Sequence, residues 1–132
     1  MEDLRQESTT AVPYNPEKEK FLLVRRADDY SRNPGLWEFP GGILEDETPK
    51  ESAFRELKEE TGLAGELVRS GDPVRLELDV GPVNVYPFLV KVEGEPELSH
   101  EHSDYQWIGI DELDSFDTIE GLEKELKSLG LK

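Results

Sequence analysis

Residues 40–63 carry both a turn and a complete set of helix boundary signals. The stretch reads PGGILEDETPKESAFRELKEETGL, so Pro-Gly-Gly precedes a segment with helical character. Thr48 is a suitable N-cap, Pro49 suits the first helical position, and Glu51 completes a capping box. Gly62 supplies a C-terminal stop. These signals predict a helix that ends at residue 60 or 61.

Three Glu side chains share one face of this predicted helix. Glu56, Glu59 and Glu60 are spaced i, i+3 and i+4, so they project together, while apolar side chains such as Leu57 face the core. Carboxylates this close repel one another unless a cation lies among them, and Mg²⁺ is a hard ion that prefers oxygen ligands. The alternative is a solvated acidic face on an acidic protein.

Composition limits the classes of protein and partner. The chain has 132 residues, which predicts a single domain over residues 1–132. It has no Cys, no long apolar run and no signal-peptide pattern, which favours a cytoplasmic protein that neither spans nor binds a membrane. The formal net charge of −16 argues against binding duplex nucleic acid. A phosphate-ester substrate would require divalent cations to neutralise its site.

The rest of the chain predicts an α/β fold with a mixed sheet between helices. A Gly81-Pro82 hairpin turn separates two long apolar strands, and residues 27–35 form a polar loop. Residues 118–130 show helical apolar spacing and predict a C-terminal amphipathic helix. Strands are expected at 9–14, 21–26, 36–39, 74–80, 83–92 and 104–110.

The helix and its preceding turn resemble the signature of the Nudix hydrolases, G-x5-E-x7-R-E-U-x-E-E-x-G-U, where U is bulky and aliphatic. The chain fills every fixed position of this signature. The flanking stretches 22–26 and 35–42 are similar to the mutator-type (MutT-like) branch of the family. The residues that match the signature are Gly41, Glu47, Arg55, Glu56, Leu57, Glu59, Glu60, Gly62 and Leu63.

This resemblance implies a Nudix-type α/β/α sandwich that hydrolyses a nucleoside diphosphate linked to a further group. It implies Mg²⁺ as cofactor, with Mn²⁺ as a substitute, and Glu47 paired with Arg55 to brace the loop and helix. The implied metal ligands are the carbonyl of Gly41 and the carboxylates of Glu56, Glu59 and Glu60. Bound metal would activate a water, and Glu56 is one candidate for the general base.

Residues outside the signature extend the resemblance. Arg26 would contact substrate phosphate, although it could equally be a surface charge at a strand end. Phe39 would line the base pocket, although core packing is the alternative, and Glu38 would point away from Trp37 and Phe39.

The segment HEHSDYQW offers a second acid. Glu101 lies where family members place a metal ligand or base, with a solvated loop acid as the alternative. His100 and His102 have the spacing of a metal pair, but we interpret both as solvated loop residues because no third ligand of that kind is evident. Glu120 lies near where some relatives place a residue that reads the base.

The substrate class is predicted by elimination of other classes known in the family. The chain lacks a convincing counterpart of the residues that mark ADP-ribose or dinucleoside polyphosphate enzymes, which favours a nucleoside triphosphate, including an oxidised one, cleaved to the monophosphate and pyrophosphate. ADP-ribose, dinucleoside polyphosphates or another nucleotide remain alternatives, as does a catalytically silent Nudix binding module. A small-molecule nucleotide is the expected partner, and the protein is expected to be a monomer or a homodimer.

Overall fold

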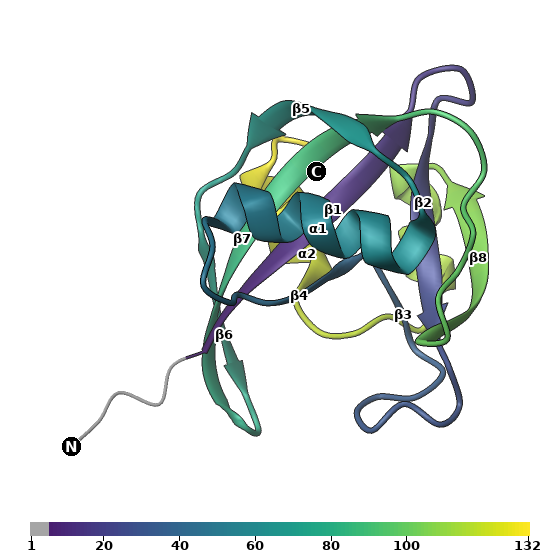
Figure 1. Cartoon of the computed structure of the whole chain (residues 1–132). Helices are drawn as coiled ribbons and strands as arrows, with labels where there is room; N and C mark the ends of the chain where they lie inside the picture. The colour runs from purple at the N-terminus through teal and green to yellow at the C-terminus, as the bar shows by residue number, and fades with distance from the viewer. Residues whose placement is uncertain (1–5) are drawn as a thin grey trace.

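The computed structural model describes residues 6–132 and shows one mixed sheet with a helix on each face (Figure 1). None of the helices in residues 6–132 is long and apolar enough to cross a membrane. In chain order the elements are β1 (Gln6–Asn15), β2 (Lys20–Arg26), β3 (Trp37–Glu38), β4 (Gly41–Ile43), α1 (Pro49–Thr61), β5 (Gly65–Ser70), β6 (Val74–Leu78), β7 (Gly81–Val92), β8 (His102–Ile108), a 3-10 helix η1 (Ile110–Ser115) and α2 (Leu122–Ser128).

The sheet is built around one long parallel pair. β1 and β7 run parallel from the Gln6–Val83 pair to the Tyr14–Lys91 pair, and all other ladders are antiparallel. β7 carries β6 and β5 along its other edge, and β2 carries β8. Such a mixture of parallel and antiparallel ladders confirms the predicted mixed sheet.

β1 and β2 pair with each other only next to the turn that joins them. Their ladder is limited to the Tyr14–Phe21 and Asn15–Lys20 pairs, after which the two strands diverge. The segment 37–43 fills the resulting gap, because β3 pairs with β2 while β4 pairs with β1. Between them, the Ala11 amide donates a hydrogen bond of 2.8 Å to the Pro40 carbonyl. The divergence therefore brings the Pro-Gly-Gly turn into the middle of the sheet.

Strand alternation divides the core into two layers. Leu22 and Val24 of β2 pack with Leu57 of α1, whereas Leu23 packs on the other face with Leu126 of α2. The central strands β1 and β7 divide their side chains in the same way. Each helix covers one face of the sheet, which confirms the predicted α/β/α sandwich.

The boundaries of α1 agree with its sequence signals. The Thr48 side chain accepts a hydrogen bond from the Glu51 amide, and the Glu51 side chain accepts one from the Thr48 amide. Gly62 adopts φ 74°, the left-handed conformation that ends a helix, and its amide donates to the Lys58 carbonyl.

Other boundaries differ from the predictions. The β6–β7 hairpin turns at Asp79 and Val80, because Leu78 already pairs with Gly81, so the turn predicted at Gly81-Pro82 is wrong by two residues. β5 was not predicted, since it is an exposed edge strand without apolar alternation. β8 begins two residues early, at His102, and ends at Ile108, whereas α2 begins only at Leu122.

Glu125 on the inner face of α2 should make the stability of the protein depend on pH. Burial raises the pKa of this carboxyl from 4.5 to about 7, against the opposing effect of the Thr10 hydroxyl. The unfolded chain therefore ionises first, and stability falls as the pH rises from about 4.5 to about 7.

Glu125→Gln should remove this contribution. We expect the variant to be more stable than the wild type by about 3 kcal/mol at pH 8, and expect this difference to shrink toward pH 4.5. Urea unfolding at several pH values measures the difference. A constant difference across this range would show that Glu125 does not titrate as its burial requires.

Candidate functional site

Arg55 ties the start of the α1 segment to the helix itself. Its guanidinium donates to the Glu47 carboxylate from Nη2 at 2.6 Å and from Nε at 3.1 Å, and to Glu59 from Nη1 at 2.8 Å. Glu56 lies 3.1 Å from the same Nη1. The pKa of Glu47 is lowered, first by the hydrogen bond from Arg55. Arg55 thus fixes the loop on the helix and neutralises part of its acidic face.

Gly41 and Gly42 allow the turn to approach its neighbours closely. A Cβ on Gly42 would lie 2.7 Å from Oε1 of Glu56, and one on Gly41 would collide with the Thr9 carbonyl. Only glycine fits at either position without a shift of the surrounding groups. This contact places the backbone of the turn directly against the acidic face of α1.

Glu60 is a buried carboxyl whose hydrogen-bonding neighbour is another carboxyl, that of Glu56. Its side chain is 3% exposed, and no N–H or hydroxyl group among residues 6–132 donates to Oε1 or Oε2. Burial raises the pKa of Glu60 far above its ordinary value. Neighbouring carboxylates raise it further, those of Glu56, Glu38 and Glu101. The site therefore gathers negative charge around a carboxyl that has been removed from water.

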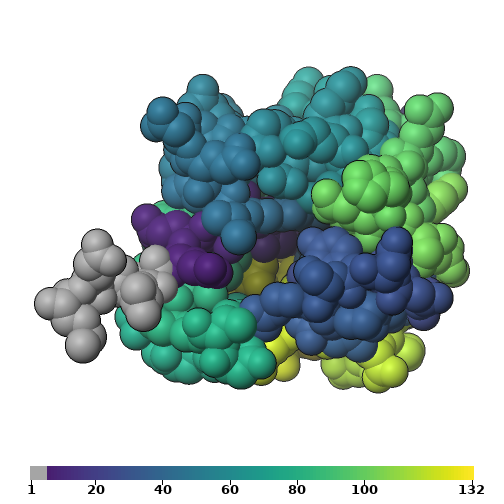
Figure 2. Space-filling view, turned by 60° about the horizontal axis from the view of Figure 1, so that its bottom comes forward, coloured from purple at the N-terminus to yellow at the C-terminus, as the bar shows by residue number. Residues whose placement is uncertain are grey.

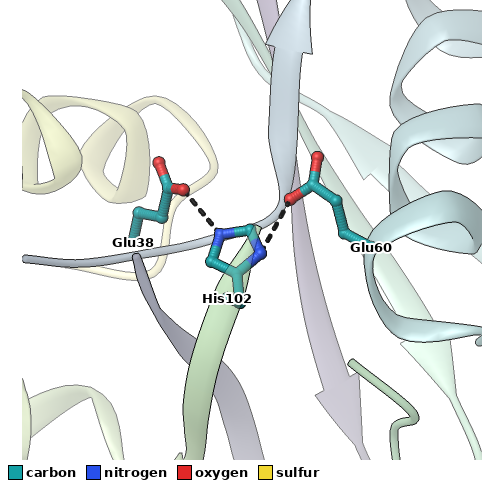
Figure 3. Close-up of side chains that lie close together, drawn as sticks. All are labelled: Glu38, Glu60 and His102. Carbon is teal, nitrogen blue, oxygen red and sulfur yellow. Dashed lines mark hydrogen bonds and ion pairs between the residues drawn. The ribbon is translucent and has the colours of Figure 1, made fainter. Parts of the chain in front are cut away.

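His102 lies between two of these carboxyls, one from β3 and one from α1 (Figure 3). Its Nε2 is 2.8 Å from Oε2 of Glu38, whereas its Nδ1 lies 3.7 Å from Oε1 of Glu60 and has no hydrogen-bond partner. With its proton on Nε2, the imidazole would donate a hydrogen bond to Glu38, and the lone pair of Nδ1 would face Glu60. One atom from each of the three residues lies within 4.8 Å of the others, which is close enough for a metal ion.

The position of His102 corrects the sequence interpretation. We interpreted both histidines as solvated, and His100 is indeed exposed. His102 is buried at the start of β8, so this interpretation is wrong for His102. It failed because the strand was expected to begin at residue 104, which left residue 102 in a loop.

The residues present fit a divalent cation. Two orphaned buried groups, the Glu60 carboxyl and Nδ1 of His102, face each other across a distance too long for a hydrogen bond. Carboxylate oxygens suit Mg²⁺ and Mn²⁺, whereas an imidazole nitrogen suits softer divalent ions such as Fe²⁺, Ni²⁺ and Zn²⁺, and a carboxylate on the far nitrogen commonly orients a metal-binding imidazole. Glu38 occupies that supporting position.

Arg26 is partly buried at the end of β2, with its side chain 15% exposed. Its Nη2 donates to Glu38 at 2.9 Å, its Nη1 donates to the Arg32 carbonyl at 2.7 Å, and its guanidinium lies 4.6 Å from the Tyr30 ring centroid. These contacts hold the side chain in place, and its contact with substrate phosphate stays a prediction. Arg25, the preceding residue, hydrogen-bonds Ser103 on the exterior.

A cavity of about 750 Å³ opens beside these groups. Figure 2 shows it as a hollow between β1, the β6–β7 hairpin and the loop 27–35, with the C-terminal segment on its floor. Gly41, Gly42 and Arg26 line it near the carboxylates, and Glu125 lines its α2 side. Phe39 belongs both to the core and to the cavity wall, and its contact with a base stays a prediction.

The remaining predicted residues lie around this centre. Glu101 is half-buried in the loop before β8, and its carbonyl accepts a 2.9 Å hydrogen bond from the Ala27 amide. Its charge contributes the smallest of the effects that raise the pKa of Glu60, and Glu101 is not among the residues that line the cavity. Glu59 is the most solvated acid of the signature and lies toward Arg55. Glu120 lines the cavity.

Sequence reasoning missed the contacts of two buried acids in this region, Glu38 and Glu125. Glu38 was expected only to point away from Trp37 and Phe39, and its bonds to Arg26 and His102 come from strand pairing across β2. Nothing in the local sequence around Glu125 distinguishes it from the other Glu residues of α2. Its one signal is its place on the inner face, beside Leu122 and Leu126.

Comparison with known proteins decides the family. Residues 4–128 match the NUDIX domain. The chain belongs to the Nudix family. The resemblance to its MutT-like branch is also confirmed, since the MutT protein from Methanosarcina mazei Go1 has the same fold, with a TM-score of 0.85 and 30% identity over 96% of this chain and 94% of that chain.

Two Nudix relatives align over most of their length. The RNA pyrophosphohydrolase of Sulfurovum sp. (strain NBC37-1) is 33% identical over 116 residues, which cover 74% of this chain and 71% of the relative. The dihydroneopterin triphosphate diphosphatase of Haemophilus influenzae is 29% identical over 145 residues, covering 93% and 89%. The chain spans less than half the length of the first curated relatives that it matches.

His102→Ala should destabilise this Nudix domain. Loss of the imidazole leaves the Glu38 and Glu60 carboxyls facing an empty buried space, and breaking such a pairing costs about 3 kcal/mol. His100→Ala is the matched control, and it should change the free energy of unfolding by less than about 0.5 kcal/mol because His100 is exposed. Denaturant unfolding without added metal measures both. Equal effects would mean that the buried contacts of His102 contribute nothing.

Proposed function

We propose that this Nudix domain is a divalent-metal-dependent pyrophosphohydrolase acting on nucleoside triphosphates, oxidised ones included, and releasing a nucleoside monophosphate and pyrophosphate. The observation that carries this proposal is the buried Glu60 carboxyl, which no donor group satisfies, next to Glu56, whose carboxylate lies against Gly42 on the wall of a cavity of about 750 Å³. Related proteins named for RNA, 8-oxo-dGTP and dihydroneopterin triphosphate substrates support the reaction class.

The metal would be held by the acidic face of α1 and by the turn packed against it. The proposed ligands are the Gly41 carbonyl and the carboxylates of Glu56, Glu59, Glu60 and Glu101, and the free Nδ1 of His102 is placed to join them. Bound Mg²⁺ or Mn²⁺ would neutralise the diphosphate and lower the pKa of a water. The brace from Arg55 to Glu47 would keep the ligands in register with the turn.

Protein groups supply the remaining chemistry. We infer that Glu56 or Glu101 accepts a proton from the attacking water, because both flank Glu60 and neither is fully buried. Arg26 would hold a phosphate that does not react, and its bond to Glu38 orients its guanidinium at the cavity wall. Phe39 would contact the base.

The charge of the chain favours free nucleotides over long nucleic acids. With a net charge of −16, the protein would repel a nucleic-acid backbone, whereas a single nucleotide brings its own metal ions to the site. We propose a small-molecule nucleotide as the partner, no duplex nucleic acid and no membrane, a cytoplasmic location, and a monomer or homodimer.

Hydrolysis should require both metal and Glu60. In a phosphate-release screen of nucleoside triphosphates, sugar nucleotides and ADP-ribose, we expect activity with Mg²⁺ and none with excess EDTA. Glu60→Gln should lower kcat by about a hundredfold or more, because a neutral amide cannot replace a ligand charge at the transition state.

Glu66→Gln is the matched control for Glu60→Gln, since Glu66 is an exposed acid on the edge strand β5. It should keep wild-type activity. A Glu60→Gln enzyme as active as this control would rule out the metal role, and wild-type hydrolysis in EDTA would rule out the metal requirement.

Arg26→Ala should raise KM for a nucleoside triphosphate by about tenfold or more and change kcat less. A contact with a non-reacting phosphate is equally strong in the ground and transition states, so its loss appears in KM. Arg25→Ala is the control, because Arg25 bonds Ser103 and Asp28 on the exterior. A pure kcat loss would instead assign Arg26 to the leaving group.

A further inference from the structure

The C-terminal helix places a second buried carboxyl in the cavity, away from the metal-binding face. Glu125 is 2% exposed and lines the cavity from α2. The Thr10 hydroxyl hydrogen-bonds its carboxyl, but Oε1 has no partner. The proposed hydrolytic chemistry does not use this group, so its unpaired oxygen requires a separate explanation.

A carboxyl at this position is unfavourable for folding. Glu125 stands on the inner face of α2 beside Leu122 and Leu126, which are core residues. Within residues 6–132 no positively charged side chain acts on it, and burial raises the pKa of its carboxyl. An unpaired polar group in such a place is typical of functional sites, where stability has been sacrificed for recognition.

The surroundings of Glu125 match a planar heterocycle. Apolar side chains from three different elements line the same cavity, namely Phe39, Leu76, Val83, Val85 and Leu122. The few polar groups on such walls usually fix the orientation of a ligand. The cavity also reaches Gly41 and Gly42 beside the carboxylates of α1, so one nucleotide could place its phosphates there and its base near Glu125.

We propose that Glu125 is a specificity-determining residue that accepts a hydrogen bond from the exocyclic amino group at C6 of adenine or C4 of cytosine, so that adenine and cytosine nucleotides are preferred over guanine, uracil and thymine nucleotides. This inference rests on the proposed function. A carboxyl can accept from an amino group in either protonation state, whereas the ionised form repels the carbonyl that guanine, uracil and thymine carry at the same edge.

The discrimination arises because the partner atoms are buried. A buried acceptor that faces a carbonyl oxygen of the base stays without a hydrogen bond, which costs binding free energy. A site built around one such contact therefore binds a base with a carbonyl at this position much more weakly. Gln at the same position offers both a donor and an acceptor, so it can satisfy an amino or a carbonyl edge. Glu125→Gln should consequently relax the choice of base without removing the cavity.

The test compares wild type, Glu125→Gln and Glu123→Gln at pH 8 with Mg²⁺. Glu123 lies on the exposed face of the same helix and is the matched control. For each protein, kcat and KM are measured with ATP, GTP, CTP, UTP and dTTP. We expect wild type to favour ATP and CTP over GTP, UTP and dTTP by about tenfold or more in kcat/KM, and Glu125→Gln to lose this preference mainly through KM.

A second readout separates recognition from structure. Glu125→Gln and Glu125→Leu should both raise the melting temperature and abolish the base preference. Replacement of a residue with a structural role would instead lower the melting temperature. An unchanged base ranking in Glu125→Gln, or a wild type without base preference, would overturn the inference and leave the hydrolase proposal intact.

A wild type that hydrolyses no nucleotide would overturn the proposed function instead. Calorimetric binding of AMP, GMP, CMP and UMP then decides the inference independently. Tighter binding of AMP and CMP than of GMP and UMP that disappears in Glu125→Gln would support it, and equal binding of all four would overturn it.

Discussion

An ionised carboxylate is costly in a protein interior unless a positive charge accompanies it, and Glu60 is the residue at which this Nudix domain meets that constraint. Its carboxyl is buried, receives no hydrogen bond from an N–H or hydroxyl group of residues 6–132, and has further acids around it, with Glu56 within hydrogen-bonding reach. The cationic side chains close by are already engaged, Arg55 with Glu47 and Arg26 with Glu38. A bound divalent cation would supply the missing positive charge. The acidic face of α1 would then be explained as a cation-binding surface.

The architecture supports this centre through the divergence of β1 and β2. Because these strands separate after two residue pairs, the segment 37–43 can pair with both, and it carries Glu38 and the two glycines into the gap. On the far edge of β2, β8 pairs its first residue, His102, with Arg26. Strand pairing thus gathers side chains from three strands, β2, β3 and β8, while α1 supplies further acids from one face of the sheet (Figure 1).

The sequence predicts those parts of this arrangement whose signals are local. Caps, a proline and a glycine define α1, and helical periodicity alone places Glu56, Glu59 and Glu60 on one face. The contact of Glu38 with His102 depends on the register of three strands distant in the chain, which no local pattern encodes. The edge strand β5 and the burial of Glu125 were not predicted for a related reason. Their side chains look like ordinary solvent-facing ones until the packing is known.

Direct measurement of metal binding without nucleotide tests the central claim that Glu60 belongs to a cation site. Mn²⁺ is titrated into the protein while the electron paramagnetic resonance signal of the free ion is followed, for wild type, Glu60→Gln and the exposed control Glu66→Gln. The account predicts that wild type and the control remove Mn²⁺ from solution equally, and that Glu60→Gln binds it at least tenfold more weakly. Equal Mn²⁺ binding by all three proteins would contradict it.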